Sequence, residues 1–119
     1  MKDLLLEQDV DFLVETFYHK LQKNDVLSPF FIHTNWEQHL PKMKHFWNFI
    51  LFDKPGFRGN IYDAHVNRQI KSPHFDIWLQ LFCDTVNENF KGINATKATE
   101  KARELSLLFS WKLEEMEGK

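Results

Sequence analysis

Apolar residues recur at helical spacing in four stretches of this sequence, and that periodicity constrains the fold more than any other feature. Side chains three or four positions apart lie on one face of an α-helix, so each stretch can bury one side of a helix. The stretches cover residues 10–21, 36–51, 75–90 and 98–113. No stretch alternates apolar and polar residues as a half-buried strand does. We therefore predict an all-α fold, with residues 1–119 forming a single domain.

Capping residues mark where three of the predicted helices begin. Asp9 is the expected N-cap of the first, because its carboxylate can accept the free N–H groups of the first turn. Thr34 and Glu37 have the spacing of a capping box before the second helix. Ser72 followed by Pro73 predicts the start of the third, since proline needs no amide hydrogen at the first helical position.

Proline and glycine predict the interruptions. The segment 27–32 contains a proline and is too short for a full helix, so we expect a turn or a single helical turn. Pro41 lies inside the second stretch and should bend that helix or delay its start. Residues 53–60 form the clearest loop, and a short segment, 61–70, follows it. Gly92 separates the last two helices.

Composition narrows the function classes. The chain carries 12 Phe, 4 Trp and 2 Tyr but only 4 Gly, where average usage of about 7% would give about 8. So few glycines disfavour a sandwich of tight turns and a Gly-rich nucleotide loop. A net charge of −2 lacks the basic footprint of a nucleic-acid binder, and no apolar run approaches the ~20 residues that span a bilayer. We therefore expect no nucleic-acid or membrane partner. The single cysteine cannot form an intrachain disulfide, which favours a cytoplasmic protein.

Histidine, cysteine and serine spacing gives little support to a zinc site or a hydrolase. His33, His39 and His45 are six residues apart, which places them on different faces of a helix. The sequence has no His-x3-His or Cys-x2-Cys pair, the spacings typical of zinc ligands. Cys83 is expected to be a small buried apolar side chain. No serine lies in the Gly-x-Ser-x-Gly turn of a hydrolase.

Three predicted helices each carry one ring with a polar tip on the inner face, namely Tyr18, His39 and Trp78. A lone histidine on an apolar face is usually an ordinary core residue. Buried polar tips need partners, however, so the three rings either pair with one another or surround something polar. His65 lies in a short segment between two loops. It is either exposed or presents a nitrogen into a cavity, as a metal or haem ligand does.

Four pieces of the sequence together resemble the group III truncated haemoglobins. They run from Phe17 to Phe31, from Trp36 to Trp47, through the isolated His65, and from His74 to Phe82. The ordered set of Tyr, His, Phe-Trp, His and Trp-Leu is similar to that family over about residues 10–110. The other two groups of truncated haemoglobins carry paired glycines, whereas this chain has no Gly-Gly, in agreement with the third group.

The resemblance implies a two-over-two helical sandwich around haem b, which is iron protoporphyrin IX. On it, His65 corresponds to the proximal iron ligand, and Tyr18, His39 and Trp78 correspond to polar residues on the distal side. Met43 stands where a branched aliphatic residue is expected, and its length and flexibility change the expected shape of the distal cavity. The residues that correspond to porphyrin contacts or pocket walls are Phe31, Met43, Phe46, Trp47 and Phe82. Candidate partners of the haem propionates are Lys54, Arg58 and Arg68.

The resemblance further implies a haem protein that binds O2, NO, CO or peroxide. A Tyr hydroxyl and an indole N–H stabilise a ligand that carries partial negative charge, and so slow its release. Slow release favours peroxidase-like or NO dioxygenase-like redox chemistry, with electrons from an external donor, over bulk O2 delivery. O2 storage or sensing is the alternative. On the residue pattern alone, a haem-free helical interaction module with the rings as its core also stays open.

Overall fold

All four predicted stretches form helices in the computed structural model, which describes residues 1–55 and 72–117. Helix α1 spans Glu7–Lys23, the 3₁₀ helix η1 spans Ser28–Phe31, and α2 spans Trp36–Phe52. Helix α4 spans Ser72–Asn89, and α5 spans Ile93–Glu117. The described residues contain no strand, so the predicted all-α fold is confirmed. None of these helices is both long and apolar enough to cross a membrane.

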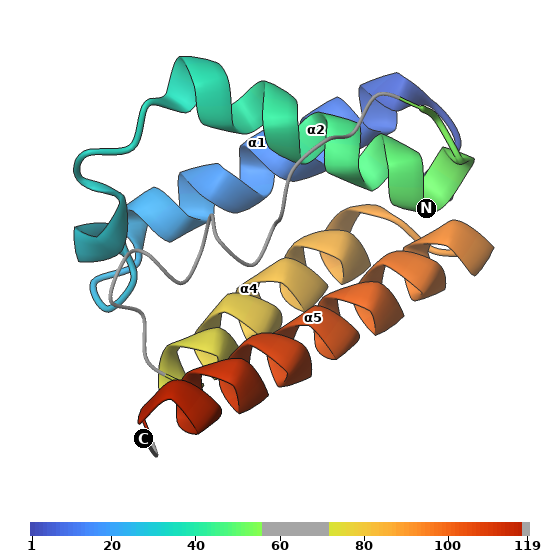
Figure 1. Cartoon of the computed structure of the whole chain (residues 1–119). Helices are drawn as coiled ribbons and strands as arrows, with labels where there is room; N and C mark the ends of the chain where they lie inside the picture. Colours follow the sequence, from blue (N-terminus) through green and yellow to red (C-terminus); the bar gives the residue numbers. More distant parts are fainter. Residues whose placement is uncertain (56–71, 118–119) are drawn as a thin grey trace.

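The helices pack as two pairs, one over the other (Figure 1). In one layer, α4 and α5 run antiparallel and make the most extensive contact within the described residues. In the other layer α1 crosses α2, and η1 packs on α1. The layers meet where α1 contacts α4 and where α2 contacts α5. This is the predicted two-over-two arrangement.

Each helix buries the apolar stripe that its sequence predicts, with one shift on α5. Leu108 is expected on the inner face, but 43% of its surface is exposed. Ser106 lies inside instead, and its hydroxyl donates a hydrogen bond to the carbonyl of Phe75 at 3.2 Å. The reason is geometric, because Leu105 and Phe109, together with the alanines one and two turns before Leu105, centre the buried face nearer to position 106 than to 108.

The start of α1 corrects the predicted N-cap. Leu6 occupies the cap position, and Asp9 lies inside the first turn of a helix that begins at Glu7. The Asp9 carboxylate reaches back and accepts hydrogen bonds from the backbone N–H groups of Leu5 and Leu6, at 3.0 and 2.9 Å. Asp9 therefore satisfies free donors as expected, but it does so from within the helix.

Helix α2 begins at Trp36 with Asn35 as its cap, so the prediction of Thr34 as the cap is wrong by one residue. The expected late start is also wrong, because Pro41 lies inside the helix. Pro41 and Glu37 are both exposed, so water can serve the Glu37 carbonyl that lacks a donor at position 41. Of the two forms expected for residues 27–32, a turn or a single helical turn, the structure has the helical turn η1. The Ser72-Pro73 signal marks the start of α4, but the helix begins at Ser72 itself, one residue before the predicted first position.

The end of α2 agrees with the predicted loop. Asp53 ends the helix in the left-handed conformation, with φ of 54°. The loop predicted for residues 53–60 is described only as far as residue 55. Its remainder and the predicted segment 61–70 lie outside the described residues.

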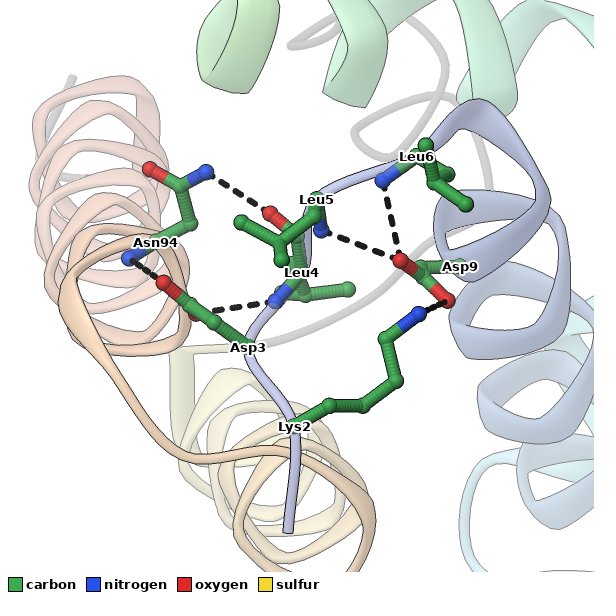
Figure 2. Close-up of polar contacts among 7 residues, drawn as sticks. All are labelled: Lys2, Asp3, Leu4, Leu5, Leu6, Asp9 and Asn94. Atoms are coloured by element: carbon green, nitrogen blue, oxygen red, sulfur yellow. Dashed lines mark hydrogen bonds and ion pairs between the residues drawn. The ribbon is translucent and has the colours of Figure 1, made fainter.

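A polar network, here called the N-terminal anchor, ties the residues before α1 to the start of α5 (Figure 2). The Asp3 carboxylate accepts hydrogen bonds from the backbone N–H groups of Asn94 and Ala95, at 3.0 and 2.8 Å. The Asn94 side chain donates in return to the carbonyl of Leu4 at 2.7 Å. Because Asn94 lies in the first turn of α5, Asp3 serves as the cap of a helix 91 residues further along the chain. The anchor comprises Lys2, Asp3, Leu4, Asp9 and Asn94.

Gly92 lets Asp3 approach the start of α5. Its φ of 144° is one that residues with side chains rarely adopt. A Cβ at this position would lie 2.5 Å from Asp3 Cγ, well inside van der Waals contact. Both the backbone conformation and the available space therefore require glycine. The predicted boundary at Gly92 is confirmed. Its physical reason is the close approach of Asp3 from the other end of the chain.

Candidate functional site

Tyr18 and His39 face each other across the contact between α1 and α2. Their ring centroids lie 5.0 Å apart with the ring planes at 90°, an edge-to-face contact. Both rings are buried, with exposed fractions of 3% and 8%. Tyr18 lies on the buried stripe of α1, and His39 begins the buried face of α2. Helical periodicity thus brings two of the three predicted polar-tipped rings into direct contact.

Two further rings surround this pair, one from η1 and one from the start of α2. Trp36 contacts Tyr18 and His39 edge to face, at centroid distances of 5.5 and 5.6 Å. Phe31 stacks against Trp36 at 5.9 Å and meets Tyr18 at 6.4 Å. The short helix η1 matters here, because it is the element that carries Phe31 back to α1.

Trp78 joins the same group from α4. Phe17 touches Tyr18 on one side at 5.1 Å and Trp78 on the other at 5.7 Å. Trp78 in turn stacks on Phe82 at 5.9 Å, and Phe82 stacks on Trp47 at 4.8 Å. The rings therefore form one connected group contributed by both layers of the fold. We call it the aromatic cluster; it comprises Phe17, Tyr18, Phe31, Trp36, His39, Trp47, Trp78 and Phe82.

The structure gathers most of the predicted site residues around this cluster. Phe46 contacts Trp47 at 5.2 Å, and Met43 is buried in the same core with 1% of its surface exposed. Lys54 lies at the surface, where its ammonium is 3.7 Å from the carboxylate of Glu7. The predicted iron ligand His65, like Arg58 and Arg68, lies outside the described residues.

Two members of the cluster, Phe17 and Trp36, were not singled out by the sequence as site residues. Phe17 lies next to Tyr18 on the α1 stripe, so its place beside a candidate residue is visible in the sequence. Trp36 lies three positions before His39, a spacing that places two side chains on the same face of a helix. Each signal is also what ordinary core packing produces. Only the contacts between helices distinguish these two rings from other buried residues.

The chemistry of the cluster is that of an apolar wall with a few polar ring edges. Among the described residues, no three His, Cys, Asp or Glu side chains lie close enough to hold a metal ion between them. Cys83 takes no part in the cluster's ring contacts. Burial raises the pKa of its thiol, although Arg103 nearby opposes the shift and Asp84 adds to it. A raised pKa leaves the thiol neutral. Cys83 is half-buried rather than buried, so the prediction of a buried side chain is not confirmed.

Comparison with known proteins shows what this sequence and fold are similar to. No family model matches the sequence. The group 3 truncated hemoglobin ctb of Campylobacter jejuni is 27% identical over 88 residues, which are 68% of this chain and 69% of that protein. A crystal structure of group III truncated hemoglobin from Campylobacter jejuni matches with a TM-score of 0.84 at 26% identity, over 95% of both chains. The resemblance to the group III truncated haemoglobins is confirmed.

The likeness to truncated haemoglobins implies a haem, so the described residues can be tested for their fit to one. Haem is a flat and largely apolar ring, and it needs flat or flexible apolar neighbours. Phe31, Trp47 and Phe82 provide aromatic rings, and Met43 provides a flexible thioether, all of them buried. Tyr18 and Trp78 add hydroxyl and N–H donors at ring edges. The chemistry of these side chains fits the cofactor that the truncated haemoglobin fold implies.

Proposed function

We propose that the chain binds haem b and uses it to bind O2, NO, CO or peroxide beside Tyr18, His39 and Trp78. One observation carries the proposal. Tyr18 and His39 are in ring contact at 5.0 Å, and Phe17 links them to Trp78, all within a truncated haemoglobin fold. A haem-free interaction module needs only packed rings. It does not need polar-tipped rings from three different helices to meet in one buried group.

The proposed roles follow from the donors that each side chain carries. A haem supplies an iron with one open coordination position when it is held by a single histidine. We assign that histidine as His65. The Tyr18 hydroxyl and the Trp78 indole N–H donate hydrogen bonds to a small ligand that carries partial negative charge. His39, held against Tyr18, is the third polar group of the same site.

The remaining residues shape the pocket and exclude water. The aromatic rings and Met43 supply apolar surface on which hydrogen bonds to a ligand gain strength, because water does not compete for them. Lys54, Arg58 and Arg68 are the proposed partners of the haem propionates. The proposed walls are Phe31, Met43, Phe46, Trp47 and Phe82.

Strong donors slow the release of O2, which suits redox chemistry better than bulk delivery. We therefore propose peroxidase-like or NO dioxygenase-like turnover in the cytoplasm, with electrons from a separate donor. O2 storage or sensing is the second candidate, and the same donors favour it if no electron donor reduces the protein. Turnover with peroxide or NO in the presence of a reducing partner separates the two.

The absorption spectrum of the purified chain tests haem binding directly. We expect a Soret band in the ferric and dithionite-reduced forms, a shift of that band on adding O2 to the reduced form, and uptake of added haemin by any apoprotein. A chain with no Soret band that also fails to take up haemin is a helical module, and the proposal is then wrong.

A His65→Ala variant tests the assignment of the iron ligand. We expect it to lose most of its haem affinity, because one histidine holds the iron of a globin and the variant removes the histidine assigned to that role. The matched control is His33→Ala, which removes an exposed histidine and should bind haemin like the parent chain. If His65→Ala binds haemin with normal affinity, another residue is the iron ligand.

A further inference from the structure

Trp36 occupies the solvent edge of the aromatic cluster. It is the first residue of α2 and is partly exposed, whereas the three rings that it touches are all buried. Those rings are Tyr18 at 5.5 Å, His39 at 5.6 Å and Phe31 at 5.9 Å. One side of the indole therefore faces the cluster, and the remainder lies towards solvent.

The three contacts fix the orientation of the indole. Phe31 stacks nearly parallel to it, at 28°, while Tyr18 and His39 meet it at 63° and 75°. A ring held by one stacked and two edge-to-face neighbours has little freedom to rotate. His39 is likewise held between Tyr18 and Trp36, and loss of the indole would leave only one of these two ring contacts.

We propose that Trp36 is a positioning residue, which holds the His39 ring against Tyr18 and closes the solvent side of the cluster. This role makes Trp36 a determinant of how fast water and small ligands reach Tyr18 and His39. The statement about His39 rests on the contacts alone. The statement about ligands rests on the proposed function as well, so the two require separate measurements.

The first measurement is the rate at which diethyl pyrocarbonate modifies each histidine in the full-length purified chain, read by mass spectrometry. His39 is buried and should react slowly, while the exposed His33 and His45 act as internal standards for the reagent. In Trp36→Ala we expect His39 to react about tenfold faster, in line with the loss of an edge-to-face ring contact and its cover. Trp36→Phe, which keeps a ring, should restore most of the protection.

Trp111→Ala is the matched control, because it removes a tryptophan that is 58% exposed on α5 and belongs to no ring contact of the cluster. It should leave the His39 rate unchanged. If Trp36→Ala unfolds by circular dichroism, Trp36→Leu, whose volume is closer to that of the parent residue, carries the same expectation. An unchanged His39 rate in the folded variants overturns the proposal. Unfolding of both variants also overturns it, because Trp36 then supports the whole fold rather than His39.

The second measurement is the bimolecular rate of CO rebinding after flash photolysis of the haem-loaded, reduced chain. We expect a several-fold faster rate in Trp36→Leu and no change in Trp111→Ala. A faster His39 modification without a faster CO rate keeps the positioning role and overturns the control of access. A chain that takes up no haemin instead contradicts the proposed function, and the His39 result still decides the positioning role.

Discussion

The N-terminal anchor and the aromatic cluster surround their polar groups in opposite ways, since the polar side chains of the anchor are half-buried or exposed and the polar-tipped rings of the cluster are buried. In the anchor, the Asp3 carboxylate is surrounded by backbone N–H groups of its own chain, at 2.8 to 3.0 Å. In the cluster, the polar-tipped rings of Tyr18, His39 and Trp78 are surrounded by the faces and edges of other rings. The Asp3 carboxylate accepts backbone hydrogen bonds that hold two distant segments of the chain together. Polar edges set in an apolar wall can recognise a small polar ligand.

We therefore expect the anchor to contribute to stability and, under the proposed function, the cluster to contribute to ligand chemistry. Substitutions in the anchor should lower the free energy of unfolding and leave ligand kinetics unchanged. Conservative substitutions at the polar tips of the cluster should change ligand kinetics and leave the free energy of unfolding unchanged.

Tyr18→Phe has the largest expected effect, an acceleration of O2 dissociation by about 10- to 100-fold, the loss expected for a hydrogen bond to a partly charged ligand. The substitution keeps the ring and its contacts with Phe17 and His39. Stopped-flow replacement of O2 by CO on the haem-loaded chain measures the rate. Trp78→Phe should act in the same direction, and Asp3→Ala should leave the rate at the parent value. If neither ring substitution speeds release, the assignment of donors to the cluster is wrong.

Gly92→Ala tests the anchor from its backbone side. We expect the free energy of unfolding to fall by about 1–3 kcal/mol, because the backbone at position 92 has a φ of 144°, which is strained for any residue with a Cβ. The new Cβ also meets Asp3 Cγ at 2.5 Å. Urea denaturation at fixed haem occupancy measures the change. In a double-mutant cycle with Asp3→Ala, the combined loss should be smaller than the sum of the single losses. Additive losses mean that Gly92 and Asp3 act independently.

The fold was largely predictable, because a 3.6-residue period states which side of each helix is buried before any partner is known. The same periodicity placed Tyr18, His39 and Trp78 on inner faces, which is a local property. It could not reveal that Phe17 links Tyr18 to Trp78, since that contact depends on how α1 crosses α4. The resemblance to a family, carried by the spacing of these residues, predicts that Tyr18, His39 and Trp78 share one site, but it does not predict the Phe17 contact that links them.

The anchor was beyond sequence reasoning for a related reason. Asp3 caps a helix that begins 90 positions later, and no local pattern pairs an aspartate with so distant a donor. Gly92 was visible only as a boundary. Asp9 was recognised as a capping residue, but its register was wrong because a carboxylate can reach the same N–H groups from either side of the helix start.

Asp3→Ala should lower the free energy of unfolding by about 1–2 kcal/mol near neutral pH, the usual cost of removing a cap. Burial alone raises the pKa of the Asp3 carboxyl, but the N–H groups of Asn94, Ala95, Leu4 and Ile93 outweigh it and hold the pKa below 3.8. The contribution is therefore complete above pH 3.8 and disappears as the pH falls through the lower pKa of the folded chain. Urea titrations of parent and variant at pH 6 and at a pH well below 3.8 should show the difference shrinking. A constant difference contradicts the role of the charged carboxylate.

Lys2→Met should have the smallest effect, a loss of about 0.5 kcal/mol or less, as for most exposed ion pairs. The Lys2 ammonium lies 2.9 Å from the Asp9 carboxylate, but half of the lysine side chain is in solvent. Burial raises the pKa of Asp9, while the Lys2 contact and the N–H groups of Leu5 and Leu6 lower it by more. Since the two backbone donors remain in the variant, Asp9 should keep part of its depressed pKa. NMR titration of the carboxyl measures this directly, and 0.5 M salt should reduce the parent's advantage in urea. A loss as large as that of Asp3→Ala would place the strength of the anchor in its ion pair rather than in its backbone hydrogen bonds.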